Sequence, residues 1–192
     1  MRTACQLFAA LILLSFVGFT PKDKEPWDYN KSDWSAIMKS AYYNDTLKVG
    51  VLTKQGIDIN SKNKNGWTAL KVSVKKGNTK TVSFLLRHHA NPNIADKDAF
   101  TPLMEACQHS YTGIVKLLLD KGANPNAALL NGWTAIMSAA SQNNDLSILE
   151  LLIQYKADVN AMRTVDGITA LKLAEYDKDS KKVMFLKKHG AK

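Results

Sequence analysis

Residues 101–126 decide the fold, and they read TPLMEACQHSYTGIVKLLLDKGANPN. Thr101 can cap a helix through its hydroxyl, and Pro102 then takes the first helical position, where its missing N–H costs little. After a polar turn, the run from Ile114 to Leu119 has the apolar spacing that buries one face of a second helix. Gly122 suits the left-handed residue that often ends a helix. The segment therefore predicts two short helices joined by a turn.

The same pattern recurs along the chain with a fixed period. A Thr/Ser-Ala/Pro-Leu/Ile triplet stands at residues 35–37, 68–70, 101–103, 134–136 and 169–171. Successive triplets are 33, 33, 33 and 35 residues apart, and the two extra residues fall near Asn143-Asn144 and Thr164-Val165. Such a period is typical of a solenoid, because a unit that cannot bury its own apolar face must stack on its neighbours.

The period, the triplet, the apolar helix and the recurring ending Ala157-Asp158-Val159-Asn160 together resemble the ankyrin repeat. The resemblance covers residues 33–192 and implies an all-α solenoid of about five helix–loop–helix repeats with short hairpin loops. We place the repeats at 33–64, 65–97, 98–130, 131–165 and 166–192. The family's Thr-Pro-Leu-His signature lacks its histidine in every repeat, where the replacements are Met38, Lys71, Met104, Met137 and Lys172.

Residues 1–20 have the pattern of a signal peptide, and residues 21–32 form an N-terminal flank before the repeats. Arg2 precedes an apolar run of 13 residues, Leu7 to Phe19, which is short for a membrane span of about 20 residues. We therefore expect an exported protein, periplasmic or secreted, of bacterial type. Phe19 and Pro21 weaken the cleavage site, so an uncleaved membrane anchor is the alternative.

Charge and motifs favour a binding protein over an enzyme. The formal net charge of +9 can favour acidic partners, although the lysines are scattered as on a solvated surface. We find no motif of a nucleotide-binding loop, metalloprotease, serine hydrolase or dithiol redox site. We therefore expect no catalysis, no cofactor and no bound metal. Cys107, in an apolar stretch, is expected to be a small buried residue.

Two rows of residues are candidates for contact with a partner. The position before each triplet holds Trp34, Trp67, Phe100, Trp133 and Ile168. Aromatic residues exposed along the hairpin edge would be interface hot spots, whereas the alternative is that they pack against the neighbouring hairpin. The resemblance places a second row, at the ends of the first helices, in a concave groove: Tyr42, Tyr43, Lys75, Lys76, Gln108, His109, Ser141, Gln142, Tyr176 and Asp177.

These features predict an exported, monomeric, non-catalytic module that binds a partner protein through the concave groove and the hairpin tips. The mixed second row suits a protein surface with some acidic character, and a nucleic acid would need a longer basic stripe. One alternative is an inhibitor or immunity-type protein for a specific enzyme or toxin. The other is an envelope structural or stress-protection factor held in the membrane by residues 1–20.

Overall fold

The computed structural model describes residues 33–142 and 146–192. The predicted signal peptide at 1–20, the flank at 21–32 and the extra residue near Asn143-Asn144 lie outside the described residues. Everything said of the structure below concerns the described ranges.

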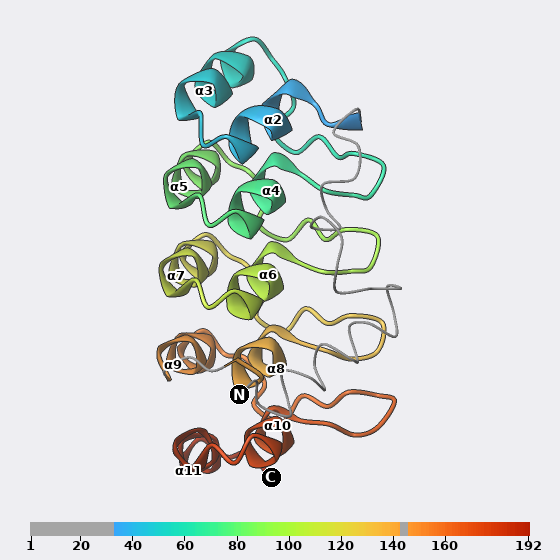
Figure 1. Ribbon diagram of the computed structural model, residues 1–192, viewed down its shortest axis with the longest axis vertical. Helices are drawn as coiled ribbons and strands as arrows, with labels where there is room; N and C mark the ends of the chain where they lie inside the picture. Colours follow the sequence, from blue (N-terminus) through green and yellow to red (C-terminus); the bar gives the residue numbers. More distant parts are fainter. Residues whose placement is uncertain (1–32, 143–145) are drawn as a thin grey trace, which may run out of the picture.

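Ten α-helices in the described ranges form two parallel columns (Figure 1). The inner column consists of α2 (Ala36–Tyr42), α4 (Ala69–Lys75), α6 (Pro102–Gln108), α8 (Ala135–Ala140) and α10 (Ala170–Tyr176). The outer column consists of α3 (Thr46–Lys54), α5 (Thr79–Arg87), α7 (Thr112–Asp120), α9 (Ser147–Gln154) and α11 (Ser180–Lys188). The predicted all-α repeat solenoid is confirmed.

Four hairpin loops project from the inner column to one side of the stack (Figure 1). We number them along the chain as the first (57–67), second (90–100), third (123–133) and fourth (157–168) hairpin loops. A backbone hydrogen bond closes each loop, as from the N–H of Leu129 to the carbonyl of Trp133 at 2.9 Å. The β-structure in the described residues amounts to two isolated bridges in the third and fourth loops.

The residue that opens each triplet caps an inner helix in four of the five repeats. The hydroxyls of Ser35, Thr68, Thr101 and Thr169 each accept a hydrogen bond from the backbone N–H three residues later. Such a bond satisfies a donor that the first helical turn leaves without a partner. Thr134 is the exception, because its buried hydroxyl makes no hydrogen bond within the described residues.

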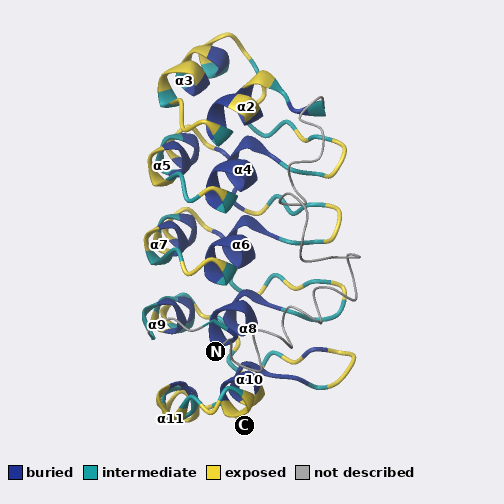
Figure 2. Cartoon of the chain, viewed as in Figure 1, coloured by how far each residue is buried: buried dark blue, intermediate teal, exposed yellow. Residues whose placement is uncertain are grey.

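The inner helices are covered on nearly all sides, whereas the outer helices bury one face (Figure 2). Six of the seven residues of α6 are buried, because α4, α8 and α7 all pack against it. In α7 the buried face contains Ile114, Val115, Leu118 and Leu119. Cys107 is fully buried as expected, and burial raises the pKa of its thiol, so the thiol stays protonated at neutral pH.

Asparagine side chains join each repeat to the next at the base of the hairpin loops. In each case the side-chain oxygen accepts a backbone N–H from the following repeat. The pairs are Asn60 with Asn91 at 2.9 Å, Asn93 with Asn124 at 2.7 Å, Asn126 with Asp158 at 2.7 Å and Asn160 with Lys192 at 2.9 Å. The asparagine of the recurring Ala-Asp-Val-Asn ending therefore binds its repeat to the next one.

Two glycines allow neighbouring hairpin loops to touch. Gly66 and Gly132, each preceded by an asparagine, have φ angles of 78° and 82°, which glycine adopts at no steric cost. A Cβ atom on Gly132 would lie 2.8 Å from the carbonyl oxygen of Met162, and one on Gly66 would lie 3.1 Å from Cα of Asp96. The glycines therefore serve the contact between loops as well as the turn within each loop.

A left-handed residue follows each outer helix, at positions 56, 89, 122, 156 and 190, as the sequence predicts for Gly122. At two of these positions the residue is not glycine, and His89 and Lys156 have φ angles of 64° and 67°. A side chain in this conformation carries a steric cost that glycine avoids.

Lys182 is buried, although the other lysines of α11 are exposed. Lys182 is 1% exposed, and its ammonium group donates to the carbonyl of Gln142 and lies 3.3 Å from Asp179. A cation near the end of α8 is favourable, because the carbonyl oxygens there have no partner within the helix.

Among residues 33–142 and 146–192, none of the helices combines the length and the apolar character that crossing a membrane requires.

We expect Leu118→Ala in α7 to lower the free energy of unfolding by roughly 2–5 kcal/mol through the cavity that it leaves. The matched control is Leu130→Ala, because Leu130 is 92% exposed whereas Leu118 is 0% exposed. Urea denaturation followed by circular dichroism measures both. Equal losses for the two variants would contradict the placement of Leu118 in the core between repeats.

Candidate functional site

The predicted second row lies at the C-terminal ends of the five inner helices, where Ser141 is buried and Tyr176 is exposed. Tyr43, Lys76 and His109 are exposed and follow directly on α2, α4 and α6. Tyr42, Lys75, Gln108 and Gln142 are half-buried beside them. Because the inner helices stack in parallel, these equivalent positions form one line along the stack. We call the surface made by these helix ends and the four hairpin loops the inner face.

The row before the triplets is more enclosed than an exposed aromatic ladder. Trp34 is 5% exposed and Ile168 is 6% exposed, so both belong to the core. Trp67, Phe100 and Trp133 are half-buried and pack against that core. The Nε1–H of Trp133 donates to the hydroxyl of Ser138 at 2.8 Å, so this ring lies against its own inner helix, α8. Packing against the neighbouring hairpin stays the alternative for this row. A partner-binding role for Trp34, Trp67, Phe100 and Trp133 stays a prediction.

Cations cover the half-buried rings. The ammonium group of Lys71 lies 4.7 Å from the ring centroid of Phe100 and 5.8 Å from that of Trp67. The guanidinium of Arg163 lies 6.0 Å from the ring centroid of Trp133. Such contacts are attractive because the face of an aromatic ring is electronegative. The contact of Lys71 with Phe100 crosses from the second repeat to the third, whereas the contacts of Trp67 and Trp133 lie within one repeat. Truncating Trp67 would remove packing as well as surface.

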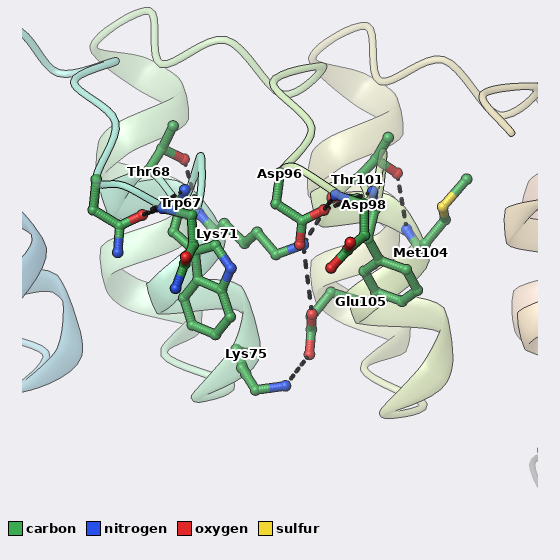
Figure 3. A network of polar contacts seen from close by, with 12 residues as sticks. Trp67, Thr68, Lys71, Lys75, Asp96, Asp98, Thr101, Met104 and Glu105 are labelled. Atoms are coloured by element: carbon green, nitrogen blue, oxygen red, sulfur yellow. Dashed lines mark hydrogen bonds and ion pairs between the residues drawn. The ribbon is translucent and has the colours of Figure 1, made fainter. Parts of the chain in front are cut away.

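A buried ionic network joins the second and third repeats behind the inner face (Figure 3). Lys71 is 1% exposed, and its ammonium group lies 2.7 Å from Asp96 and donates to the carbonyl of Phe100 at 2.7 Å. Glu105, 3% exposed, lies 3.8 Å from the same ammonium group. Lys71 stands at the position of the missing signature histidine, so the replacement carries a charge into the interior.

Glu105 connects this buried network to the surface row. Its carboxylate lies 2.7 Å from the ammonium group of Lys75 and 3.1 Å from Nε2 of His109. Two predicted contact residues, Lys75 and His109, are therefore held by one buried carboxylate. Side chains fixed in this way lose less conformational freedom when a partner binds.

Burial and charge oppose each other within the network. Burial lowers the pKa of Lys71, although Glu105 and Asp96 favour its charged form. Burial alone would raise the pKa of Glu105, but the hydrogen bond with His109 and the charges of Lys75 and Lys71 outweigh it. The net result is a pKa of about 2 for Glu105. The carboxylate is therefore ionised at neutral pH and completes the ion pairs.

The sequence pattern does not link Lys71, Asp96 and Glu105 to one another. In the sequence, Lys71 stands out only as a departure from the ankyrin signature. The available signal was a lysine at an inner-helix position that holds methionine in three other repeats, because a lysine buried there would require an acceptor nearby. Nothing in the sequence indicated that Asp96, in the tip of the second hairpin loop, would turn inward to provide it.

Two further features bear on chemistry at the surface, namely a pocket on the outer column and the spacing of potential metal ligands. A shallow pocket on the outer column is lined by Thr46, Thr79, Lys80, Ser83, Phe84, Arg87 and Leu117. This lining contains no acid, histidine or cysteine that could pair with its two cations in acid–base chemistry. In the part of the chain that the structure describes, no three histidine, cysteine or acidic residues gather as a metal site would require.

Two family models match the chain. The model described as "Ankyrin repeats (3 copies)" matches residues 10–95 and 37–129, and the model described as "Ankyrin repeat" matches residues 131–163. Together these matches extend over most of the sequence and over the first four predicted repeats. A comparison with curated proteins finds no match.

We expect Lys71→Met to lower the free energy of unfolding by roughly 3–5 kcal/mol, because Asp96 and Glu105 would stay buried without their shared cation. Lys172→Met is the matched control, since Lys172 holds the equivalent place in the last repeat but is exposed. The control should change stability by less than about 1 kcal/mol. A mild effect of Lys71→Met in urea denaturation would show that the network contributes little.

We expect the stability difference between the protein and Glu105→Gln to depend on pH. The pKa of Glu105 is lowered from 4.5 to about 2, so its ionised form stabilises the fold above pH 4.5. This stabilisation, roughly 3 kcal/mol from the size of that shift, disappears as the pH falls towards 2. The glutamine variant cannot titrate there, so its curve should approach that of the unmodified protein in acid.

Urea denaturation between pH 7 and pH 2.5 measures this difference. Glu150→Gln, an exposed change on α9, is the control and should alter stability at pH 7 by less than about 0.5 kcal/mol. If the difference in unfolding free energy between the protein and Glu105→Gln stayed constant over this pH range, the neighbours of Glu105 would not stabilise its ionised form.

Proposed function

The chain belongs to the ankyrin-repeat family, and from that premise we propose that it binds a partner protein through its inner face without catalysing a reaction. Members of this family are generally protein–protein interaction modules and generally non-catalytic. The observation that carries the proposal is the line of helix-end residues, where Tyr43, Lys76 and His109 are exposed on a rigid stack.

The inner face combines the elements of a protein-binding surface. Tyr43 is 69% exposed and contacts Tyr42 edge to face, with the ring centroids 5.0 Å apart. Tyrosine buries a large area at a small entropic cost and is enriched among hot spots. Lys76 lies 4.7 Å from the ring centroid of Tyr42, so a cation and aromatic rings stand together at the first two repeats. This combination suits a partner surface with acidic character.

Rigidity supports the same proposal. The Lys71 network and the asparagine bonds hold successive repeats in register before any partner arrives. A preformed surface avoids part of the ordering cost that a flexible one incurs on binding. The face can therefore be selective even with few hot-spot residues.

We propose that the protein acts outside the cytoplasm, in the periplasm or after secretion. The support is the sequence of residues 1–20, with its positive start and 13-residue apolar run. Intact mass and N-terminal sequencing of the protein from its own host test this directly. A chain that begins after residue 20 fits the proposal, and a full-length chain in the membrane fraction fits the anchored envelope factor.

The narrower form of the proposal is an inhibitor or immunity-type protein that neutralises one enzyme or toxin. Affinity purification from the host with mass spectrometry identifies the partner. A one-to-one complex with an enzyme whose activity falls on binding would favour this form, and a structural envelope component would favour a scaffold.

We expect Tyr43→Ala and Lys76→Glu to weaken binding of that purified partner at least tenfold, because both remove exposed contacts of the inner face. Lys80→Glu is the control, since Lys80 is an exposed lysine on the outer helix α5. Calorimetric titration gives the affinities, and thermal melting verifies that the variants fold. Binding that depends on Lys80 but not on Lys76 would assign the function to the outer column.

A further inference from the structure

The tips of the four hairpin loops change in chemistry along the stack. The same tip position, repeated every 33 residues, holds Lys64, Lys97 and then Leu130. In the fourth loop, which contains an extra residue, Thr164-Val165 occupies this place. The first two tips are therefore basic, whereas the last two are apolar.

Backbone hydrogen bonds join the tips in two pairs, and all four loops project to the same side of the stack, so the tips line one edge of the inner face (Figure 1). The backbone N–H of Lys97 donates to the carbonyl of Asn65 at 3.1 Å, which joins the first loop to the second. The N–H of Thr164 donates to the carbonyl of Asn131 at 2.8 Å and joins the third loop to the fourth. We call this line of tips the hairpin edge.

The basic half of the hairpin edge consists of Lys62, Lys64 and Lys97, all exposed. Two acidic residues accompany them in the tips 62–65 and 95–98. Asp96 is turned inward and paired with the buried Lys71, which leaves Asp98 as the exposed acid of these two tips. The inward turn of Asp96 therefore increases the positive character of the edge.

The apolar half consists of Leu130, Met162 and Val165, which are 92%, 58% and 75% exposed. The third hairpin loop contains no charged residue, and in the fourth Arg163 and Asp166 form an ion pair with each other. These three apolar side chains stand on two loops that a backbone hydrogen bond joins, and exposed apolar side chains that gather on one surface are typical of interaction sites.

We propose that the hairpin edge binds a protein segment that carries acidic residues at one end and large apolar residues at the other. The acidic end faces Lys64 and Lys97, and the apolar end faces Leu130, Met162 and Val165. Because packed helices are spaced by 8–10 Å, the centres of the two halves are about 20 Å apart. An extended segment of about six residues covers that distance. The inference rests on the proposed protein-binding function and names the class of segment bound.

The edge fits two other occupants less well. A nucleic acid requires positive charge along its whole path, and here the exposed basic tips end after the second loop. Two copies of the chain related by a two-fold axis can pair their hairpin edges in two ways. In one arrangement basic tips lie against basic tips, and in the other basic tips lie against apolar tips. Neither arrangement supplies opposite charge to Lys64 and Lys97.

The test is a selection from a library of random 16-residue peptides displayed on phage, with the protein as the target. Enriched peptides are synthesised, and their affinities are measured for the protein and for two double variants. The basic-tip variant carries Lys64→Gln and Lys97→Gln, and the apolar-tip variant carries Leu130→Ser and Val165→Ser. The control variant carries Lys80→Gln and Leu47→Ser, which change an exposed lysine and an 84% exposed leucine on the outer column.

We expect the enriched peptides to share an acidic cluster and an apolar cluster, and each tip variant to weaken their binding at least tenfold. The control variant should bind as the unmodified protein does. The basic-tip variant should also lose most of the salt dependence of binding.

Four results would overturn the inference. The first two are enriched peptides that lack the two clusters, and peptide affinities that are unchanged in the apolar-tip variant. The third is a protein that binds a 16-nucleotide single-stranded DNA more tightly than the enriched peptides. The fourth is a dimer of the protein, detected by sedimentation, that Leu130→Ser dissociates. Peptides that depend on Tyr43 and Lys76 but not on the tips would overturn the hairpin edge alone and leave the proposed function standing.

Discussion

The structure depends on the contact between one helix pair and the next. An isolated pair such as α6 and α7 would expose to water the apolar side chains that neighbouring repeats cover, and α4 and α8 close α6 from both sides. Asparagine side chains and touching hairpin loops add directional bonds to this apolar contact. Stacking therefore fixes both the stability of the protein and the line of equivalent residues that forms its inner face.

The joint between the second and third repeats contains a buried network of three charged residues. Lys71 replaces the signature histidine, and Asp96 and Glu105 neutralise it from the hairpin loop and from the next inner helix. Such a network is seldom more stabilising than an apolar core, but removing one member leaves an uncompensated charge. Here it has a second consequence, because Glu105 also positions Lys75 and His109 at the surface.

The sequence predicted the features that repeat and missed the features that occur once. The 33-residue period predicted the helices, the Thr101 cap and the left-handed ends, because each depends on local residue types in a fixed pattern. The inward turn of Asp96, the burial of Lys182 and the enclosure of Trp34 depend on contacts between repeats. Local residue patterns do not show which members of a repeated row are covered by neighbouring segments, so they do not separate the buried Trp34 from the exposed Tyr43.

Hydrogen–deuterium exchange of the protein, alone and with the partner purified from its host, tests the central claim most directly. Our account predicts slower exchange at the hairpin loops and at the C-terminal ends of α2, α4 and α6 when the partner is bound. The outer helices α3, α5 and α7 should exchange as they do in the free protein. Protection confined to the outer column would contradict the assignment of binding to the inner face.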